Sequence, residues 1–145
     1  MSELPLEQYK EFHRLMPILC VDVVLVHGNS FLLLKRKNAP ACGEWWLPGG
    51  RVLRDELLAD AAKRKIREET GLESKEPEML GADETLFPDG PFGWSTHTVN
   101  IVFRADAVKG EAKVDNQSEE FQWFEKIDES WPEYVKKFLK KAGFK

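Results

Sequence analysis

Two adjacent carboxylates, Glu68 and Glu69, stand in the last turn of a helix that apolar spacing predicts up to Gly71. At about 100° per residue, both fall with Lys65 on the side of the helix that carries the apolar residues. The carbonyl end of a helix repels anions, so helix stability alone does not explain acidic residues there. Carboxylates on an inward face need a neutralising cation, and their oxygens suit Mg²⁺ and also Mn²⁺. We therefore expect a divalent-metal site.

Ion pairing is a second explanation for the same charges. Arg64 precedes Glu68 by four residues and Lys65 precedes Glu69 by four, so each pair can meet on the helix surface. In both pairs the base is N-terminal, which is the weaker orientation. Lys65 can also approach both carboxylates, and a cation there opposes a second metal ion. We expect one tightly bound ion, and the alternative for Lys65 is a side chain that extends to solvent.

A turn and a capped helix are expected to position these groups. Pro48, Gly49 and Gly50 form a turn whose carbonyls can point inward, because little side-chain bulk obstructs them. Asp55 can cap the start of the helix, and Gly71 can adopt the left-handed conformation that ends it. The last turn of the helix should then face the turn at Gly49.

Strands and helices are expected on both sides of this segment. The expected elements are a helix at 5–16, a hairpin formed by 18–26 and 31–35, strands at 79–87, 96–108 and 120–124, and a helix that follows a capping box of Ser130 and Glu133 and runs towards 142–143. The segment at 88–93 is rich in Gly and Pro, which is typical of loops that cover sites. Strands around a central helix, with helices on the faces, predict an α/β fold.

Composition favours one soluble domain. The 145 residues fit a single domain at 1–145, and 42% hydrophobic residues are enough for one core. The net charge of −4 and the dispersed basic residues argue against a nucleic-acid polymer or a membrane as partner. Cys20 and Cys42 lack the spacing of a zinc site or a disulfide framework. The N-terminus has no signal-like run, so we expect a cytoplasmic protein.

The segment around the two glutamates resembles the Nudix box. Eight of its nine defined positions are filled, and Lys65 stands where the family has glutamate. The matching residues are Gly50, Glu56, Arg64, Ile66, Glu68, Glu69, Gly71 and Leu72, preceded by Trp45, Trp46, Leu47, Pro48 and Gly49. The resemblance implies a Nudix-type α/β/α sandwich with a mixed sheet and the box's loop and helix. It further implies that the Gly49 carbonyl, Glu69 and Glu68 bind the metal, and that Glu56 and Arg64 form a structural salt bridge.

From Pro17 to about Phe124 the chain is most similar to the GDP-mannose mannosyl hydrolases. The residues that match that subfamily are Asp22, Arg36, Arg51, Thr96, His97 and Gln117. The resemblance implies Arg36 on the diphosphate as a catalytic group, Arg51 on the nucleotide, Asp22 and His97 as further substrate-binding residues, and Gln117 as a metal ligand. It also implies a homodimer. Separately, the helical spacing of apolar residues at 5–16 indicates packing on the domain or on a partner subunit, which makes 1–16 a candidate interface segment.

Two departures from the subfamily bear on the reaction. Ser118 stands where the subfamily has its histidine base, and Thr98 replaces a tyrosine that contacts substrate. A serine does not accept a proton usefully near neutral pH without a partner. The alternative bases are Glu119, Glu120, His97 and Asp89. Without such a base, attack on phosphorus replaces attack on the sugar carbon.

Three functions therefore stay open. The leading one is Mg²⁺-dependent hydrolysis of a nucleotide sugar such as GDP-mannose, which releases GDP and sugar. The second is pyrophosphohydrolysis of nucleoside triphosphates or dinucleotides by attack on phosphorus. The third is a non-catalytic nucleotide-binding domain whose site Lys65 has disabled. For a nucleobase, Phe87, Phe92 and Trp94 are better stacking candidates than Trp45 and Trp46, which packing explains.

Overall fold

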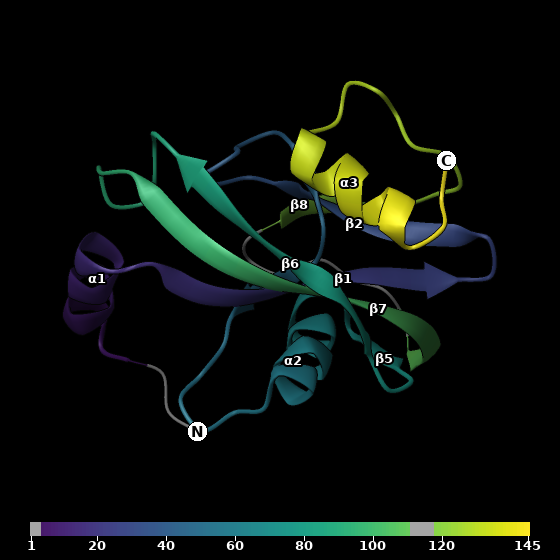
Figure 1. The fold of residues 1–145 in the computed structure, drawn as a ribbon, viewed down its shortest axis with the longest axis horizontal. Coiled ribbons are helices and arrows are strands. Elements are labelled where there is room, and N and C mark those ends of the chain that lie inside the picture. The colour runs from purple at the N-terminus through teal and green to yellow at the C-terminus, as the bar shows by residue number, and fades with distance from the viewer. Residues whose placement is uncertain (1–3, 111–117) are drawn as a thin grey trace.

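A mixed, eight-stranded sheet runs through the molecule, with α2 and α3 on opposite faces (Figure 1). The computed structural model describes residues 4–110 and 118–145. The strands are β1 (Ile18–His27), β2 (Ser30–Arg36), β3 (Trp45–Trp46), β4 (Gly49–Arg51), β5 (Leu72–Ser74), β6 (Glu78–Phe87), β7 (Thr96–Gly110) and β8 (Ser118–Phe124). The helices are α1 (Leu6–Leu15), α2 (Leu58–Thr70) and α3 (Glu133–Lys141). The α/β/α sandwich that the sequence predicts is confirmed.

Strand β1 is the centre of this sheet. It runs parallel to β7, from the pair Ile18 and Thr98 to the pair Val26 and Asp106, and antiparallel to β2 and β4. Strand β8 pairs with β2, while β6 pairs with β7. A parallel pair needs a long crossover, and the chain from β2 through α2 to β6 supplies it.

Both faces of β1 are buried in apolar cores. Val24 on one face packs in the cluster that includes Phe138 of α3. Val23 on the other face packs in the cluster that includes Ile66 of α2. Alternation of side chains along a strand explains why neighbouring residues enter different cores. Each fully buried aliphatic side chain stabilises the fold by about 1.5–3 kcal/mol, so β1 is a firm platform for the polar residues near its start.

Helix α2 begins later than its expected cap. Asp55 has a φ of 65° and Leu57 occupies the capping position, so the prediction that Asp55 caps the helix is wrong. The reason is that the preceding loop is closed by the Glu56 carboxylate, which accepts the Leu53 N–H at 3.0 Å. At the other end Gly71 has a φ of 75°, as predicted for the residue that ends the helix.

The expected capping box before α3 is also wrong. The Ser130 N–H and hydroxyl both donate to Asp128 Oδ1, at 2.8 and 2.7 Å. Glu133 instead pairs with Lys136, and Pro132 takes the capping position. An aspartate that hydrogen-bonds two residues ahead closes its own turn, which removes Ser130 from the helix start. Among the described residues, no helix has the length and apolar character needed to cross a bilayer.

Candidate active site

A cavity of about 840 Å³ opens where α1, the start of β1, β4 and the end of α2 converge. The segments at 38–41 and 90–92 complete its wall. Its charged lining residues are Asp22, Arg36, Arg51, Lys65 and Glu69. The structure thus brings together five of the charged residues that the sequence singles out, although they come from four different elements.

Glu69 faces this cavity from the last turn of α2. Its side chain belongs to a residue only 7% exposed, and its Oε1 accepts the Gly49 N–H at 2.7 Å. The Val23 N–H donates to the Pro48 carbonyl and the Val52 N–H donates to the Leu19 carbonyl, so Pro48 and Val52 direct their backbone groups towards β1. Successive residues of a strand direct these groups to alternate sides, so the N–H and carbonyl of Gly49 point away from β1. In a strand the N–H and C=O of one residue point to the same side. The Gly49 carbonyl and the Glu69 carboxylate therefore share one side of β4.

An ion pair of Glu56 and Arg64 ties the loop before α2 to the helix. Arg64 Nε donates to Glu56 Oε2 at 2.7 Å, and Arg64 Nη2 donates to the Arg51 carbonyl at 2.8 Å. This is the structural salt bridge that the sequence predicts. Burial raises the pKa of Glu56, but the hydrogen bonds from Arg64 and from the Leu53 N–H outweigh it, so the net pKa lies below the usual value. The pair holds β4 against α2, and it thereby fixes the position of Glu69 relative to β4.

Glu68 lies apart from Glu69. Its side chain is 48% exposed, and both of its carboxylate oxygens accept hydrogen bonds from Arg64 Nη1, at 3.0 and 3.1 Å. Lys65 Nζ lies 3.3 Å from Glu68 Oε2. The expectation that Glu68 shares the inward face is wrong, because Arg64 holds it outside the cavity. Ion pairing thus accounts for Glu68, whereas Glu69 has the inward position expected of a metal ligand.

Asp22 enters the cavity from β1 with an organised set of partners. The residue is 4% exposed, and its Oδ2 accepts hydrogen bonds from Asn100 Nδ2 at 2.8 Å and from the Tyr134 hydroxyl at 2.5 Å. Burial raises the pKa of Asp22, and the two hydrogen bonds oppose that rise. A methyl group at Gly49 would lie 2.0 Å from Asp22 Oδ1, so only glycine fits beside this carboxylate.

Sequence reasoning missed Asn100 and Tyr134 as partners of Asp22. An asparagine inside the apolar run of β7 was an available signal, because a buried amide requires a hydrogen-bond partner. The sequence around Tyr134 gave no such signal, since its partner Asp22 is 112 positions away. The Tyr134 ring stacks on Trp46, with centroids 5.3 Å apart and planes at 11°. Packing also occupies Trp45, whose ring meets Phe124 at 5.2 Å.

The two arginines of the cavity are each fixed by a neighbour. Arg36 Nε donates to the Pro40 carbonyl at 2.7 Å. The Arg51 guanidinium carbon lies 5.2 Å from the centre of the Tyr9 ring, a cation–π distance. Planar guanidinium groups held in this way suit the forked recognition of phosphate oxygens.

Aromatic rings form the wall on the side of α1. The His13 and Phe92 centroids lie 5.1 Å apart and those of Tyr9 and Phe92 lie 5.8 Å apart, so α1 packs on the segment that leads into β7. Burial lowers the pKa of His13, which therefore stays neutral near pH 7. Phe87 and Phe92 line the cavity, but Trp94 does not. The expectation that the segment at 88–93 covers a site agrees with this arrangement.

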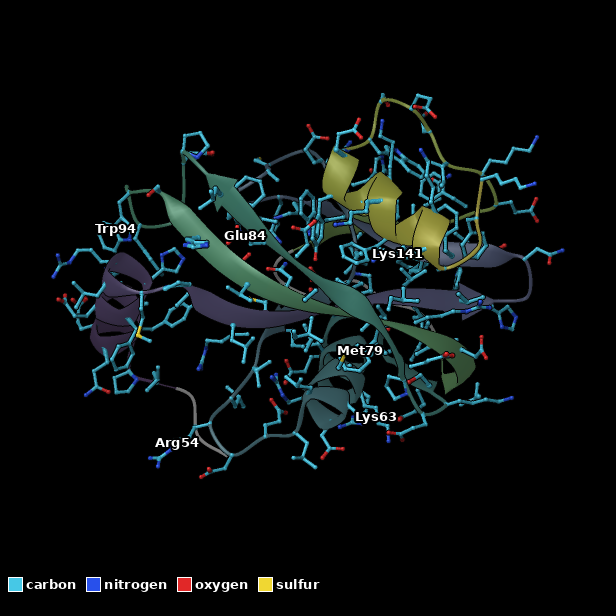
Figure 2. The ribbon with its side chains drawn as sticks, in the orientation of Figure 1. Arg54, Lys63, Met79, Glu84, Trp94 and Lys141 are labelled. Atoms are coloured by element: carbon cyan, nitrogen blue, oxygen red, sulfur yellow. The ribbon has the colours of Figure 1, made fainter. Side chains whose placement is uncertain are left out.

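His97 lies outside the cavity. Its Nε2 is 2.9 Å from Glu84 Oε2, and Figure 2 labels Glu84 on β6. Strand alternation explains this position, because Thr98 and Asn100 of β7 face the cavity and His97 takes the opposite face. Asp89 and Glu120 do not line the cavity either, and Glu120 pairs with Lys35 at 3.7 Å. The predictions for Gln117 as a ligand and for the Glu119 side chain as a base fall outside the described part of the chain.

Comparison with known proteins gives a consistent result. The family model of the NUDIX domain matches residues 16–142. An ADP-ribose pyrophosphatase of Methanocaldococcus jannaschii is 38% identical over 120 residues, which are 83% of this chain and 68% of that protein. The low-salt glycan biosynthesis protein Agl8 of Haloferax volcanii is 29% identical over 140 residues, which are 95% of this chain and 90% of that protein. A solved MutT NUDIX hydrolase from Burkholderia pseudomallei superposes with a TM-score of 0.75 at 29% identity, over 88% of this chain and 98% of that one.

Proposed function

The chain belongs to the Nudix hydrolase family, and we propose that it hydrolyses a nucleoside diphosphate linked to a sugar, with a divalent metal ion held at Glu69. One observation carries this proposal. A single cavity gathers the Glu69 carboxylate, the Gly49 backbone and the guanidinium groups of Arg36 and Arg51. Carboxylate and carbonyl oxygens beside two phosphate-type donors form the arrangement that a diphosphate with its metal ion requires.

The oxygen donors present fit one Mg²⁺ ion. Mg²⁺ is commonly bound through one or two carboxylates, with water and substrate phosphates completing its coordination. Glu69 and the Gly49 carbonyl offer such a partial set, whereas the described residues contain no group of three or more His, Cys, Asp or Glu side chains that could hold a metal. A bound ion would neutralise the diphosphate and lower the pKa of a coordinated water. Mn²⁺ has similar ligand preferences, and we expect it to substitute.

The remaining cavity accommodates the other parts of such a substrate. Its volume of about 840 Å³ lies within the range of small-molecule sites, roughly 300–1,000 Å³. Arg36 and Arg51 would bind the phosphate oxygens and stabilise the negative charge that builds on the leaving group. The rings of Tyr9, Phe87 and Phe92 offer apolar surface for a nucleobase.

We assign the attack to phosphorus rather than to the sugar carbon. The attacking water forms a new P–O bond, the bond from that phosphorus to the bridging oxygen breaks, and the products are a nucleoside monophosphate and a sugar phosphate. Two observations favour this route over release of GDP and sugar. Ser118 replaces the histidine base, and the alternative bases whose side chains the structure describes, His97, Asp89 and Glu120, lie outside the cavity. The similarity to an ADP-ribose pyrophosphatase also favours it, so ADP-ribose is the first substrate to test.

The test combines substitution with product analysis. Wild type, Glu69→Gln and the control Glu73→Gln are incubated with Mg²⁺ and with ADP-ribose, GDP-mannose, nucleoside triphosphates or dinucleotides, and the products are identified by mass. We expect wild type to convert ADP-ribose into AMP and ribose phosphate. The turnover rate of Glu69→Gln should be lower by orders of magnitude, while its thermal midpoint stays unchanged. Glu73 pairs with Arg67 at 3.8 Å, away from the cavity, so its variant should stay active.

Three outcomes would contradict the proposal or part of it. Near-full activity of Glu69→Gln would remove Glu69 from the metal site. Binding of nucleotides by wild type without any metal-dependent turnover would favour the non-catalytic alternative. Free mannose with GDP would redirect the attack to the sugar carbon. The homodimer and the cytoplasmic location stay predictions, which light scattering and cell fractionation would test.

A further inference from the structure

Lys65 extends from α2 into the cavity rather than to solvent. A methyl group placed on Gly50 would lie 2.5 Å from Lys65 Cε and 3.0 Å from Lys65 Nζ, so the ammonium rests against the β4 backbone. The side chain is 19% exposed, and the residue lines the cavity that also contains Glu69. Of the two arrangements that the sequence allows for this lysine, the structure has the inward one.

A chain of ion pairs fixes the Lys65 ammonium. Its Nζ lies 3.3 Å from Glu68 Oε2, and Glu68 is held through both oxygens by Arg64 Nη1. Arg64 is in turn anchored by Glu56, whose side chain is buried. Glu68 therefore acts as the outer support of Lys65. A lysine that is already held in place loses less side-chain entropy when it binds an anion.

The charges that line the cavity favour an anion. The side chains of Arg36, Arg51 and Lys65 contribute three positive charges, against the two carboxylates Asp22 and Glu69. At position 65 the Nudix box has a glutamate, so the substitution changes the local charge by two units. A glutamate there would add an oxygen ligand for a further metal ion, whereas a lysine excludes that ion and offers three hydrogen-bond donors.

We propose that the Lys65 ammonium binds the diphosphate of the substrate directly and supplies the positive charge that a further metal ion would otherwise provide. The proposal rests on the proposed function, since it requires a diphosphate in this cavity. Lysine is a compact point charge with donors that rotate, so it can follow the phosphate oxygens as their charge shifts during bond cleavage. One metal ion per chain is then sufficient for the reaction.

The first experiment measures substrate binding without metal. ADP-ribose and GDP-mannose are titrated calorimetrically into wild type, Lys65→Met, Lys65→Arg and Lys63→Met in EDTA. Loss of a charge-assisted hydrogen bond should weaken the affinity of Lys65→Met by about 10- to 100-fold. Lys65→Arg should stay within a few-fold of wild type. Lys63, on the same helix but paired with Glu76 and labelled in Figure 2, is the matched control and should leave the affinity unchanged.

The second experiment counts metal ions. Mn²⁺ titration followed by calorimetry or electron paramagnetic resonance should give one ion per chain for wild type and an additional ion for Lys65→Glu. Steady-state kinetics with Mg²⁺ should give a kcat/KM about 10- to 100-fold lower for Lys65→Met. Circular dichroism and thermal midpoints identify any variant that fails to fold, and Lys65→Gln, which also removes the charge, replaces Lys65→Met if that variant is unfolded.

Three results would overturn the proposal. They are an affinity and kcat/KM of Lys65→Met within twofold of wild type, two Mn²⁺ ions per wild-type chain, or an activity of Lys65→Glu above that of wild type. In each case Glu69→Gln could still be inactive, and the proposed hydrolase function would then stand without this role for Lys65. Absence of any nucleotide binding by wild type would instead contradict the proposed function itself.

Discussion

Replacement of Tyr134 by phenylalanine tests how the Asp22 carboxylate is stabilised. The Tyr134 hydroxyl donates to Asp22 Oδ2 at 2.5 Å, and Asn100 Nδ2 donates to the same oxygen at 2.8 Å. Phenylalanine keeps the ring that stacks on Trp46 and removes only the hydroxyl. Asp22 would then be a buried carboxylate that has lost one of these two donors. A hydrogen bond to a charged group contributes about 1.5–3 kcal/mol, which is the expected loss in the free energy of unfolding at pH 7.

The loss of stability in Tyr134→Phe should depend on pH, in a direction that the pKa of Asp22 determines. Burial already raises the pKa of Asp22 in the folded protein, and the Tyr134 hydrogen bond opposes that rise. Removal of the hydroxyl should therefore raise the folded pKa of Asp22 further. A carboxyl whose folded pKa is raised loses stability as the pH rises through that pKa. The destabilisation of Tyr134→Phe should thus be largest at neutral pH and should shrink at low pH, where Asp22 is protonated in both proteins.

Urea unfolding followed by tryptophan fluorescence, in EDTA at several pH values between 4 and 8, measures both effects. A double-mutant cycle with Asp22→Asn separates the hydroxyl–carboxylate interaction from other effects of the substitution. The reasoning fails if Tyr134→Phe loses less than about 0.5 kcal/mol at pH 7, the size of an ordinary surface substitution. It also fails if the loss is the same at every pH or is independent of the residue at position 22.

Two further predictions concern α2, one at its C-terminal end and one at its ion pair with the preceding loop. Gly71→Ala should destabilise the protein by about 1–2 kcal/mol in urea unfolding, because Gly71 has a φ of 75°, and an unchanged midpoint would contradict the assigned helix end. Arg64→Gln should lose about 1.5–3 kcal/mol at pH 7, and the difference from wild type should shrink as the pH falls through the lowered pKa of Glu56, since the pair is lost once Glu56 is protonated. A constant difference from pH 7 to pH 3 would show that the ion pair is not the cause.

Local patterns predicted the longer elements and the part of the site that a single helix carries. They missed the short strands β3, β4 and β5, and the turn expected from Pro48 to Gly50 is wrong, because Gly49–Arg51 pairs with β1 as strand β4. Helical spacing placed Glu69 on the inward face, and left-handed geometry at Gly71 followed from the residue type. The same spacing misplaced Glu68, because one residue is a rotation of about 100° and the nearby Arg64 then decides the outcome. The start of α2 was misplaced for a related reason, since Glu56 closes a loop that no periodicity describes.

The remainder of the site depends on contacts between distant segments. Asp22, Asn100 and Tyr134 come from β1, β7 and α3, and the spacing within each segment gives no register between them. His97 illustrates the same limit, because the parallel pairing of β1 with β7 decides which face each residue of β7 takes. A shift of the strand register by one residue moves each side chain to the opposite face of the sheet.

The parallel pairing of β1 with β7 and the hydrogen bond that Tyr134 donates to Asp22 have a consequence during synthesis. Because Tyr134 follows Asp22 by 112 positions, a ribosome must translate α3 before this carboxylate meets one of its donors. Until then α3 does not cover β1, and before β7 is made β1 also lacks its parallel neighbour, so apolar surface of β1 is available to chaperones or to other chains. We expect nascent chains arrested before α3 to be digested rapidly by protease, and resistance to arise together with enzymatic competence once that helix has emerged.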